Sequence, residues 1–483
     1  MTSPDAFPDP CGPGRFHYAG VGGSGMSALA QFQVRLGGRA SGSDRSFDAG
    51  GRDDARALLA AAGVALFPQD GSGVRGDDCA ALVVSTAVED SVPDVAAAKA
   101  RGIPILHRSE LLAWCVASQR TIAVSGTSGK SSTVAMIFEA LRGAGRDPSV
   151  ITGGDLEALR AAGLWGNAWK GGSDLLVIEA DESDGSLVRY EPAVGVVLNL
   201  QRDHKPEADV AVMFDTFAAR TREALVLGEG DNLAPLGALA RRRGLPVVSF
   251  GFGPRADVRA EDATLELGAD GSAFEALGTR FRLPVPGRHN VENALAAIAA
   301  CRVLGVEPAA LVVPLAAFEG VGRRFQSIGT AGGVEVIDDF AHNPAKIEAA
   351  LATARRRVRG RATGGRDGRV LAIYQPHGYA PTRFLRADFV DAFARALGPK
   401  DRAWWLEVFY AGGTTTRDFS SADIVADLAA RGPGDRAAFA ASREALIAAV
   451  AEEARAGDLV LVMGARDPSL TTLARSIVAA LTA

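Results

Sequence analysis

Short apolar segments alternate with longer Ala-rich, amphipathic segments along almost the whole chain. Residues 16–21, 121–125 and 175–179 have the length and the aliphatic or β-branched content that buried strands require. Residues 26–36 and 291–304 follow turns and have the length of helices. Strands that alternate with helices in this way are typical of α/β domains built on parallel sheets.

The alternation begins again three times, each time with a glycine-rich or polar turn. We therefore predict three α/β domains, 1–118, 119–326 and 327–483. Residues 262–286 alternate and carry turn signals, which predicts a small antiparallel addition to the second domain. The other predicted strands are 39–42, 81–85, 103–106, 194–200, 334–337, 370–373 and 458–463.

The composition supports several domains and excludes some classes of protein. At 483 residues the chain is too long for one hydrophobic core, and 47% apolar with 23% charged residues is typical of a soluble globular protein. A net charge of −5 gives no support to a surface that binds nucleic acid or an anionic membrane.

The N-terminal segment and the cysteines bear on the compartment. The start is polar and rich in Pro and Gly, and no run of about 18 apolar residues occurs, so neither a signal peptide nor a membrane anchor is predicted. The 4 cysteines lie far apart without a C-x-x-C pair, which argues against a zinc site or a disulfide scaffold. We therefore expect a cytoplasmic protein.

Residues 126–132, GTSGKSS, form the strongest local motif, between a predicted strand and a helix. Backbone N–H groups and the helix N-terminus of such a turn hold phosphate oxygens, and Lys130 adds a positive charge. Ser131 offers a hydroxyl to a magnesium ion. Val124 stands where the usual P-loop has its first glycine, so the match is to the shorter form G-T-x-G-K-[ST]. A plain glycine-rich turn is the alternative, which the preceding apolar strand disfavours.

Residues 20–25, GVGGSG, form a second glycine-rich turn, and Asp44 follows about 20 residues later. This spacing fits the G-x-G-x-x-G turn of dinucleotide-binding domains, in which the acidic residue binds a ribose hydroxyl. The pattern by itself leaves two interpretations open, NAD binding and a tight packing turn between strand and helix.

Candidate metal ligands follow two predicted strands of the second domain. A phosphate loop works with a divalent cation, whose hard oxygen ligands are expected at the ends of nearby strands. Glu179 begins the acidic segment EADESD, and His204 follows the next predicted strand. We predict that Glu179 and His204 bind the metal ion, with a surface acidic cluster as the alternative.

With these segments in place, the chain resembles the Mur ligase family from about residue 16 to its C-terminus. Within the family it is most similar to the enzymes that add L-alanine to UDP-N-acetylmuramate, and the ordered set of motifs is highly specific. The matching segments are GVGGSGMS (20–27), SGSD (41–44), GTSGKSS (126–132), EADESDGS (179–186), GRHNVENALAAIA (287–299), GVGRRF (320–325), IDDFAHNP (337–344), YQPHGY (374–379) and GDLVLVMGA (457–465).

The resemblance implies a fold, an activity and partners. It implies a Rossmann-like N-terminal domain that binds UDP, a central P-loop ATPase domain and a Rossmann-like C-terminal domain. Such enzymes use ATP and Mg²⁺ to convert the carboxylate of a UDP-sugar to an acyl phosphate, which an amine attacks. The turn at 20–25 would then hold UDP phosphates rather than NAD. The implied partners are a UDP-sugar carboxylate and a small amine or amino acid, for a monomer or homodimer without nucleic acid or membrane.

The resemblance also implies roles for individual residues. The implied catalytic residues are Lys130, His204, Arg324 and His342, and the implied magnesium ligands are Ser131, Glu179 and His204. The implied ATP-binding residues are Gly126, Thr127, Ser128, Gly129, Lys130, Ser131, Ser132, Asn290, Asn293, Arg324 and Asp339. The implied contacts with the UDP-sugar and the amine are Gly22, Gly23, Ser24, Gly25, Met26, Ser43, Asp44, Ser85, His377 and Arg383.

Several positions depart from the alanine-adding pattern. Phe340 and Asn343 replace the tyrosine and the second histidine of D-Y-A-H-H-P. Both arginines of the segment that usually reads QPHRYTRT are lost, to Gly378 and Pro381, although Arg383 follows closely. An arginine fork suits a carboxylate, and glycine cannot replace that interaction. We therefore expect retained ATP use with either L-alanine or another amine as acceptor.

Two other functional classes compete with an amide ligase. An NAD-dependent oxidoreductase would use the turn at 20–25 and Asp44, but it would leave the loop at 126–132 unexplained. A non-catalytic nucleotide-binding protein would have no need of Lys130 or of the acidic strand end at Glu179, and both are present.

Overall fold

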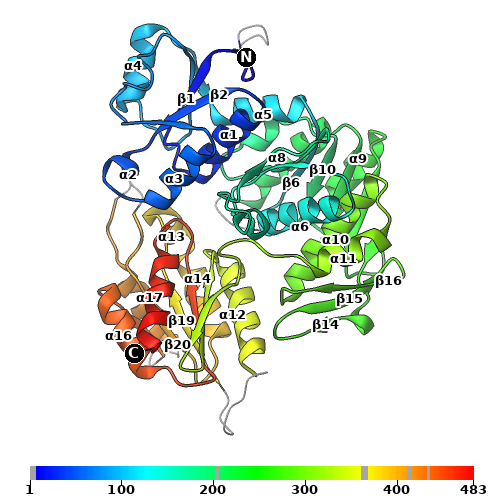
Figure 1. Ribbon diagram of the computed structural model, residues 1–483. Coiled ribbons are helices and arrows are strands. Elements are labelled where there is room, and N and C mark those ends of the chain that lie inside the picture. The colour runs from blue at the N-terminus through cyan, green and yellow to red at the C-terminus, as the bar shows by residue number, and fades with distance from the viewer. Residues whose placement is uncertain (1–6, 202–205, 360–367, 411–415, 432–435, 483) are drawn as a thin grey trace. The chain divides into compact units, whose positions relative to one another are not determined.

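The computed structural model describes residues 7–201, 206–359, 368–410, 416–431 and 436–482 (Figure 1). The chain divides into two compact units. The first comprises Met1–Leu265, Phe274–Leu283 and Asn290–Val321, and the second comprises Glu266–Ala273, Pro284–His289 and Gly322–Ala483. The division after Val321 lies close to the boundary predicted near 326. The boundary predicted near 118 falls inside the first unit and stays a prediction.

The first unit begins with a five-stranded sheet in the order β3-β2-β1-β4-β5, and all neighbouring strands are parallel. The glycine-rich turn joins its central strand to a helix, as predicted. The strands are β1 (Arg15–Ala19), β2 (Arg39–Ser43), β3 (Ala65–Phe67), β4 (Cys79–Val84) and β5 (Ile105–His107). The helices are α1 (Ser24–Arg35), α2 (Arg45–Asp48), α3 (Asp53–Ala61), α4 (Pro93–Arg101) and α5 (Arg108–Ala117).

An eight-stranded sheet in the order β13-β12-β11-β10-β6-β9-β7-β8 follows in the same unit. Its strands are β6 (Arg120–Ser125), β7 (Ser149–Ile151), β8 (Ala168–Trp169), β9 (Leu175–Glu179), β10 (Val194–Val197), β11 (Ala224–Gly228), β12 (Val247–Gly251) and β13 (Val258–Arg259). All pairs are parallel except the antiparallel pair of β7 and β8. Because β10, β6, β9 and β7 are parallel neighbours, their carboxyl ends share one edge of the sheet.

Burial on both faces explains why the central strands of this sheet are continuously apolar. Leu176, Val177 and Ile178 of β9 are fully buried. Ala-rich helices pack closely on the strands because alanine combines high helix propensity with a small side chain. The helices of this part are α6 (Lys130–Gly143), α7 (Glu157–Arg160), α8 (Glu207–Arg220), α9 (Ala234–Arg242), α10 (Arg288–Val303) and α11 (Pro308–Ala316).

A three-stranded sheet, β14 (Glu266–Leu267), β15 (Ser272–Ala276) and β16 (Thr279–Leu283), occupies the segment predicted as an antiparallel addition. β14 and β15 pair antiparallel, with Glu266 opposite Ala273. The antiparallel pairing predicted within residues 262–286 is therefore confirmed, whereas the assignment of this segment to the second predicted domain stays a prediction.

The second unit contains a six-stranded sheet in the order β17-β18-β22-β19-β20-β21. Its strands are β17 (Gln326–Ala331), β18 (Val334–Asp339), β19 (Val370–Tyr374), β20 (Arg402–Trp405), β21 (Ala437–Phe439) and β22 (Leu459–Met463). Only β17, which was not predicted, runs antiparallel to its neighbour among these described strands.

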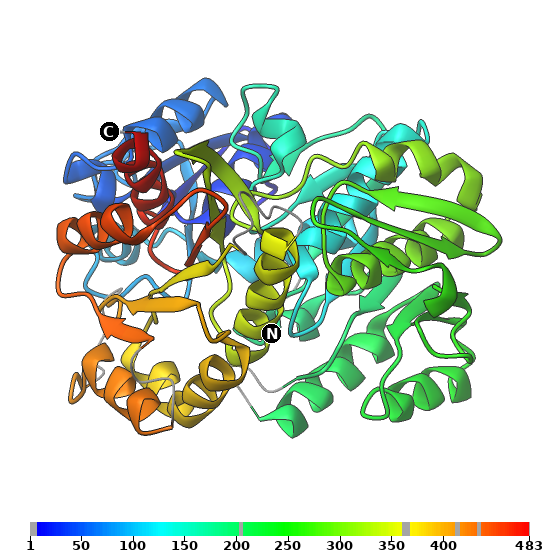
Figure 2. The same cartoon turned by 90° about the horizontal axis from the view of Figure 1, so that it is seen from below.

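Helices cover both faces of this sheet, over two separate apolar cores (Figure 2). One core gathers Trp405, Tyr374, Phe389 and Phe393, and the other includes Leu371 and Ile373 from the opposite face of β19. The helices are α12 (Pro344–Arg359), α13 (Tyr379–Phe384), α14 (Arg386–Ala396), α15 (Ser421–Ala430), α16 (Arg443–Glu453) and α17 (Leu470–Thr482). The predicted class, α/β with parallel sheets, is confirmed. Within the described ranges, none of the helices combines the length and apolarity needed to cross a membrane.

Candidate nucleotide and metal site

The loop 126–132 lies at the carboxyl edge of β6 and leads directly into α6. Gly129 precedes the helix with φ +88°, in the left-handed region, and a Cβ atom there would collide with Oδ1 of Asn293. Glycine at 129 therefore serves both the backbone turn and the close approach of α10. The backbone N–H groups of this turn and of the first turn of α6 form a cradle for phosphate oxygens.

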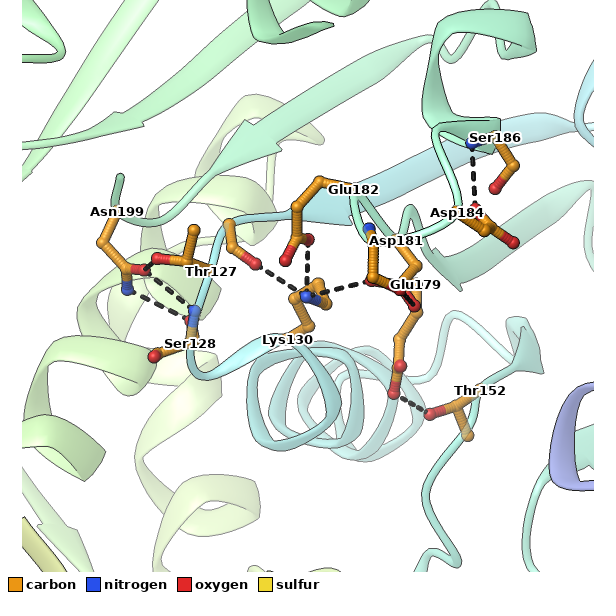
Figure 3. A network of polar contacts seen from close by, with 12 residues as sticks. Thr127, Ser128, Lys130, Thr152, Glu179, Asp181, Glu182, Asp184, Ser186 and Asn199 are labelled. Atoms are coloured by element: carbon orange, nitrogen blue, oxygen red, sulfur yellow. Dashed lines mark hydrogen bonds and ion pairs between the residues drawn. The ribbon is translucent and has the colours of Figure 1, made fainter. Parts of the chain in front are cut away.

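Lys130 lies at the centre of a polar network (Figure 3). Its Nζ donates to the carbonyl oxygen of Gly126 at 2.8 Å and to Oε2 of Glu182 at 2.6 Å. Oδ1 of Asp181 lies 3.3 Å from the same Nζ. Three acceptors thus match the three N–H bonds of the ammonium group. A phosphate that enters the loop must take the place of at least one of them.

The charges of this network are strongly coupled. Burial by itself would lower the pKa of Lys130, but Asp181 and Glu182 raise it above its usual value. Burial opposes ionisation of Asp181 as well, yet Lys130 and Ser183 hold its pKa below the usual range. For Glu182, burial and repulsion from Asp181 outweigh the attraction of Lys130, so its pKa is raised. Burial thus opposes the charged form of each of the three groups, and the contacts within the network offset it for Lys130 and Asp181.

Replacing Glu182 with glutamine is expected to tighten the binding of a non-hydrolysable ATP analogue by roughly three- to tenfold. The substitution removes a negative charge next to the incoming phosphates and a strong competitor for Nζ of Lys130. Calorimetric titration of the analogue, with and without Mg²⁺, measures the change. Glu223→Gln, which alters an exposed pair with Arg120, is the matched control. Unchanged or weaker binding by Glu182→Gln would contradict this assignment of Glu182.

Two hard oxygen donors border one glycine pair beside the loop. Ser131 is buried near the start of α6, and Glu179 ends β9. A Cβ atom on Gly154 would lie 3.1 Å from Cβ of Ser131, and one on Gly153 would lie 3.2 Å from Oε2 of Glu179. A hydroxyl and a carboxylate are ligands that Mg²⁺ accepts, so this donor set fits the predicted ion.

The third predicted metal ligand, His204, lies outside the described residues. Among the residues that are described, no group of three or more His, Cys, Asp or Glu side chains could hold a metal ion. Ser131 and Glu179 would therefore need further oxygen ligands, which phosphates and water supply in magnesium sites of this kind.

Asn199 is a loop-holding residue that the sequence did not reveal. Its Oδ1 accepts hydrogen bonds from Oγ1 of Thr127 and from the backbone N–H of Ser128, both at 2.9 Å (Figure 3). Its Nδ2 donates to the carbonyl oxygen of Ser128 at 3.1 Å. In the sequence, Asn199 is marked only as a polar residue just after an apolar strand. The pairing of β10 with β6 places it beside the phosphate loop.

The predicted adenine-side residues also lie against the loop. Oγ1 of Thr133 in α6 donates to Oδ1 of Asn293 at 3.3 Å. Nδ2 of Asn293 in turn donates to Oδ1 of Asn290 at 3.4 Å. Both asparagines lie in the first turns of α10, and both are buried. The structure therefore brings them next to the phosphate loop, while their contact with a base stays a prediction.

In the glycine turn 20–25, Asp44 supports the backbone. Its Oδ2 accepts from the N–H of Gly22 at 2.9 Å, and its Oδ1 accepts from the N–H and the hydroxyl of Ser46. Ser43 and Met26 are buried, and Ser43 donates to Asp94. Both carboxylate oxygens of Asp44 are thus used in hydrogen bonds that stabilise the turn and the start of α2. The NAD interpretation instead requires this carboxylate to bind a ribose hydroxyl.

The remaining predicted contacts of this region lie at helix and strand ends. Ser24 begins α1 after Gly23, and the described structure shows no side-chain cap at this helix end. Uncapped N–H groups at a helix start suit an anion such as a diphosphate. Ser85 directly follows β4, and its Oγ accepts from the N–H of Ala87 at 3.3 Å.

Arg108 is a second residue that the sequence did not reveal. It begins α5, and a Cβ atom on Gly25 would lie 2.9 Å from its Nη1. Its Nη2 forms an ion pair with Asp184, the last residue of the acidic segment EADESD. Arg108 thus places positive charge beside the glycine turn and connects that turn to the segment that begins with Glu179.

In the second unit, the turn at 323–325 has an unusual backbone. Arg323 and Phe325 have φ of 59° and 53°, which non-glycine residues rarely adopt. Asp339 stabilises this turn, because its Oδ2 accepts from the N–H of Phe325 and its Oδ1 from the N–H of Ala341, each at 2.7 Å. Burial raises the pKa of Asp339 to about 6 despite the nearby guanidinium of Arg324. The guanidinium carbon of Arg324 lies 4.5 Å from the ring centroid of Phe340.

Two predicted histidines meet at the carboxyl ends of β18 and β19. The rings of His342 and His377 are edge to face, with centroids 5.3 Å apart. Nδ1 of His342 lies 2.9 Å from the carbonyl oxygen of Phe340, so in the neutral ring Nδ1 donates and Nε2 keeps the lone pair. Arg383 forms an exposed ion pair with Asp418.

The departures at Gly378 and Pro381 are parts of one structural change. Gly378 precedes α13 with φ 69° and ψ 123°, a conformation that is costly for any residue with a Cβ atom. A Cβ atom there would also lie 3.1 Å from Cγ of Pro381. An arginine at 378 would be strained in this turn, so the loss of the family arginine involves the backbone as well as the side chain.

Known proteins resemble the chain over nearly its whole length. Family models match three consecutive parts: "Mur ligase family, catalytic domain" matches residues 15–120, "Mur ligase middle domain" matches 124–301 and "Mur ligase, glutamate ligase domain" matches 323–466. The UDP-N-acetylmuramate–L-alanine ligase of Thermobifida fusca is 36% identical over 484 residues, with 97% of each chain covered. The protein of the same name from Clavibacter michiganensis subsp. michiganensis is 39% identical over 422 residues, which cover 85% of this chain and 83% of that one.

Solved structures share the fold. The UDP-N-acetylmuramate–alanine ligase of Thermotoga maritima has a TM-score of 0.77 and 26% identity, and the match covers 96% of this chain and 98% of that one. A murein peptide ligase from Psychrobacter arcticus has a TM-score of 0.68 and 21% identity over 97% of this chain and 98% of that one.

Proposed function

The chain belongs to the Mur ligase family, and we propose that it joins the carboxylate of UDP-N-acetylmuramate to the amino group of L-alanine at the expense of ATP. The observation that carries this proposal is the similarity to UDP-N-acetylmuramate–L-alanine ligases along almost the whole chain, which spans all three of the proposed domains. A similarity confined to the phosphate loop would support nucleotide binding alone.

We assign the binding of the three substrates to three domains, 1–118 for the UDP-sugar, 119–326 for ATP and 327–483 for the amine. The glycine turn and the uncapped start of α1 support the first assignment, and the loop around Lys130 supports the second. The two imidazoles at the carboxyl ends of β18 and β19 support the third. We also propose that the protein works in the cytoplasm as a monomer or homodimer.

The reaction is a phosphoryl transfer followed by an acyl transfer. A carboxylate oxygen of the sugar attacks the γ-phosphorus of ATP, so that an acyl phosphate forms and ADP leaves. The amine nitrogen then attacks the acyl carbon, and phosphate leaves from the tetrahedral intermediate as the C–N bond is made. The amine must lose a proton, and we assign Nε2 of His342 to accept it. Nζ of Lys346 lies 3.4 Å from this Nε2 and must give up that contact before the proton is transferred.

The phosphate loop performs the first of these steps. Lys130 exchanges its contact with Glu182 for the phosphate oxygens, and the loop amides hold the transferring group in line. Ser131 and Glu179, with His204 as the proposed third ligand, would hold the Mg²⁺ ion, which neutralises negative charge on the phosphates. Asn199 keeps the loop in the conformation that this arrangement needs.

A second candidate function is the same reaction with another amine. Gly378 and Pro381 favour this second function, because they stand at the two positions where the alanine-adding pattern has arginine. The backbone conformation at Gly378 would also strain an arginine introduced there. In this case the carboxylate of the acceptor is bound differently or is missing from the acceptor.

The test is Mg²⁺-dependent phosphate release from ATP with UDP-N-acetylmuramate and a panel of single amines, with products identified by mass. A rate with L-alanine and a product of matching mass would establish the proposed reaction. A product with another amine alone would establish the second candidate. If ATP binds but no amine of the panel gives phosphate release or product, both candidate functions are refuted and a non-catalytic nucleotide-binding role is favoured.

A further inference from the structure

Two buried side chains, Thr152 and Asn167, connect the metal carboxylate with the helix that follows the glycine turn. Thr152 directly follows β7, and Asn167 directly precedes β8. The antiparallel pairing of these strands brings the two residues together, and the N–H of Thr152 donates to the carbonyl oxygen of Asn167 at 3.0 Å. Thr152 is 2% exposed and Asn167 is fully buried.

Asn167 binds the first turns of α1 with all the polar atoms of its amide. Its Nδ2 donates to the carbonyl oxygen of Ser24 at 3.0 Å and to Oγ of Ser27 at 2.8 Å. Its Oδ1 accepts from Nε2 of Gln31 at 2.9 Å. A buried amide with every donor and acceptor used has one orientation, so the start of α1 and the start of β8 keep a fixed separation.

Thr152 sets the orientation of Glu179. Its Oγ1 accepts from the N–H of Gly154 at 3.2 Å, so its own hydrogen points to Oε1 of Glu179, 2.5 Å away (Figure 3). One carboxylate oxygen of Glu179 is therefore held by a protein donor, and the other faces the glycine pair that also borders Ser131. A series of hydrogen bonds thus connects Ser24 with Glu179. It runs through the side chain of Asn167, the backbone pair of Asn167 and Thr152, and the hydroxyl of Thr152.

We propose that Thr152 and Asn167 are positioning residues that make two binding events depend on each other. One event is the binding of a diphosphate at the glycine turn and the start of α1, and the other is the binding of magnesium and nucleotide at Glu179. The inference rests on the proposed function, because it assumes that a UDP-sugar occupies the turn. A shift in the first turn of α1 is transmitted through the buried amide, the backbone pair of Asn167 and Thr152, and the hydroxyl to the carboxylate, since each step is a direct hydrogen bond between buried groups.

The test is a calorimetric titration of the magnesium complex of a non-hydrolysable ATP analogue into the full chain, with and without saturating UDP-N-acetylmuramate. The ratio of the two Kd values measures the coupling, and in the unmodified protein we expect about fivefold or more. We expect the ratio to fall to about one in Thr152→Val and in Asn167→Ala, while each ligand by itself binds within about threefold of its normal Kd. Thr152→Ser, which keeps the hydroxyl, should restore the ratio.

Two matched variants control for the loss of a buried polar group. Thr121→Val removes a fully buried hydroxyl that donates to the carbonyl oxygen of Val116, away from the series. Gln33→Ala removes a buried amide of α1 that bonds Pro10 and Tyr18. Both should keep the normal ratio. The proposal is overturned by a ratio of one in the unmodified protein, by a normal ratio in Thr152→Val and Asn167→Ala, or by an equal loss in the controls.

Failure of the proposed substrate gives a different result. If UDP-N-acetylmuramate does not bind although the nucleotide does, the same titrations are run with UDP, whose diphosphate probes the same turn. If UDP shows coupling that disappears in Thr152→Val and Asn167→Ala, the positioning role is supported, but UDP-N-acetylmuramate is rejected as the substrate. Absence of coupling with UDP would overturn the positioning role itself.

Discussion

Replacement of Lys130 with alanine is expected to lower the rate of ATP-dependent product formation about a thousandfold or more. Lys130 is the only lysine of the phosphate loop, and its ammonium group is the positive charge closest to the loop carbonyl of Gly126. Negative charge develops on the γ-phosphoryl oxygens during transfer. The contact between Lys130 and these oxygens is therefore stronger in the transition state than in the bound ground state. The loss should therefore appear mainly in kcat.

Measurement of kcat and of KM for ATP with each substrate at saturation checks this expectation. Lys99→Ala, which removes a surface lysine paired with Asp90, is the matched control and should leave both constants within about twofold. Because Lys130→Ala also leaves Asp181 and Glu182 without their cation, its thermal unfolding should be recorded alongside. A folded Lys130→Ala protein with kcat within tenfold of normal would remove Lys130 from the phosphoryl-transfer step.

Replacement of Glu179 with glutamine is expected to lower kcat/KM for magnesium-ATP about a hundredfold and to raise the Mg²⁺ concentration needed for half-maximal rate. The substitution keeps the size of the side chain and the contact with Oγ1 of Thr152, but it removes the negative charge that favours a divalent cation. Excess Mg²⁺ should restore part of the rate, because the remaining ligands still bind the ion weakly.

A titration of the rate with Mg²⁺ at fixed ATP separates this effect from a general loss of activity. Glu191→Gln, which changes an exposed partner of Arg220 in the same unit, provides the comparison and should not shift the titration. If Glu179→Gln has a lower rate but the same Mg²⁺ midpoint, Glu179 is not a metal ligand, and its role lies in the shape of the site.

The local motifs and the strands and helices next to them were predictable from the sequence by itself. β9 was predicted at its observed bounds, and the loop at 126–132 was placed correctly between β6 and α6. These predictions succeeded because a buried strand and a glycine-rich turn each depend on a few consecutive residues. Several strands that lie at or next to the edge of a sheet were not predicted, because two to six residues there carry too little hydrophobic pattern; these are β3, β7, β8, β12, β13, β17, β20 and β21. The inner strand β11, whose residues are all buried, was missed as well.

Only the tertiary structure decided which side chains meet. Asn199, Arg108, Thr152 and Asn167 lie in segments without a motif, and the sequence distance from Asn167 to its partner Ser24 is 143 residues. The sheet order β10-β6-β9-β7-β8 is set by packing between distant segments. It brings the carboxyl ends of β10, β6, β9 and β7 and the amino end of the antiparallel β8 to one edge. The ion pairs of Lys130 depend on the same strand order, because Asp181 and Glu182 follow β9 and Lys130 follows its neighbour β6. The strained turn at Gly378 belongs to the separate sheet of the second unit. The types of residue needed for phosphate chemistry are therefore encoded locally, whereas their partners and orientations follow from burial and strand order, which no short stretch of sequence specifies.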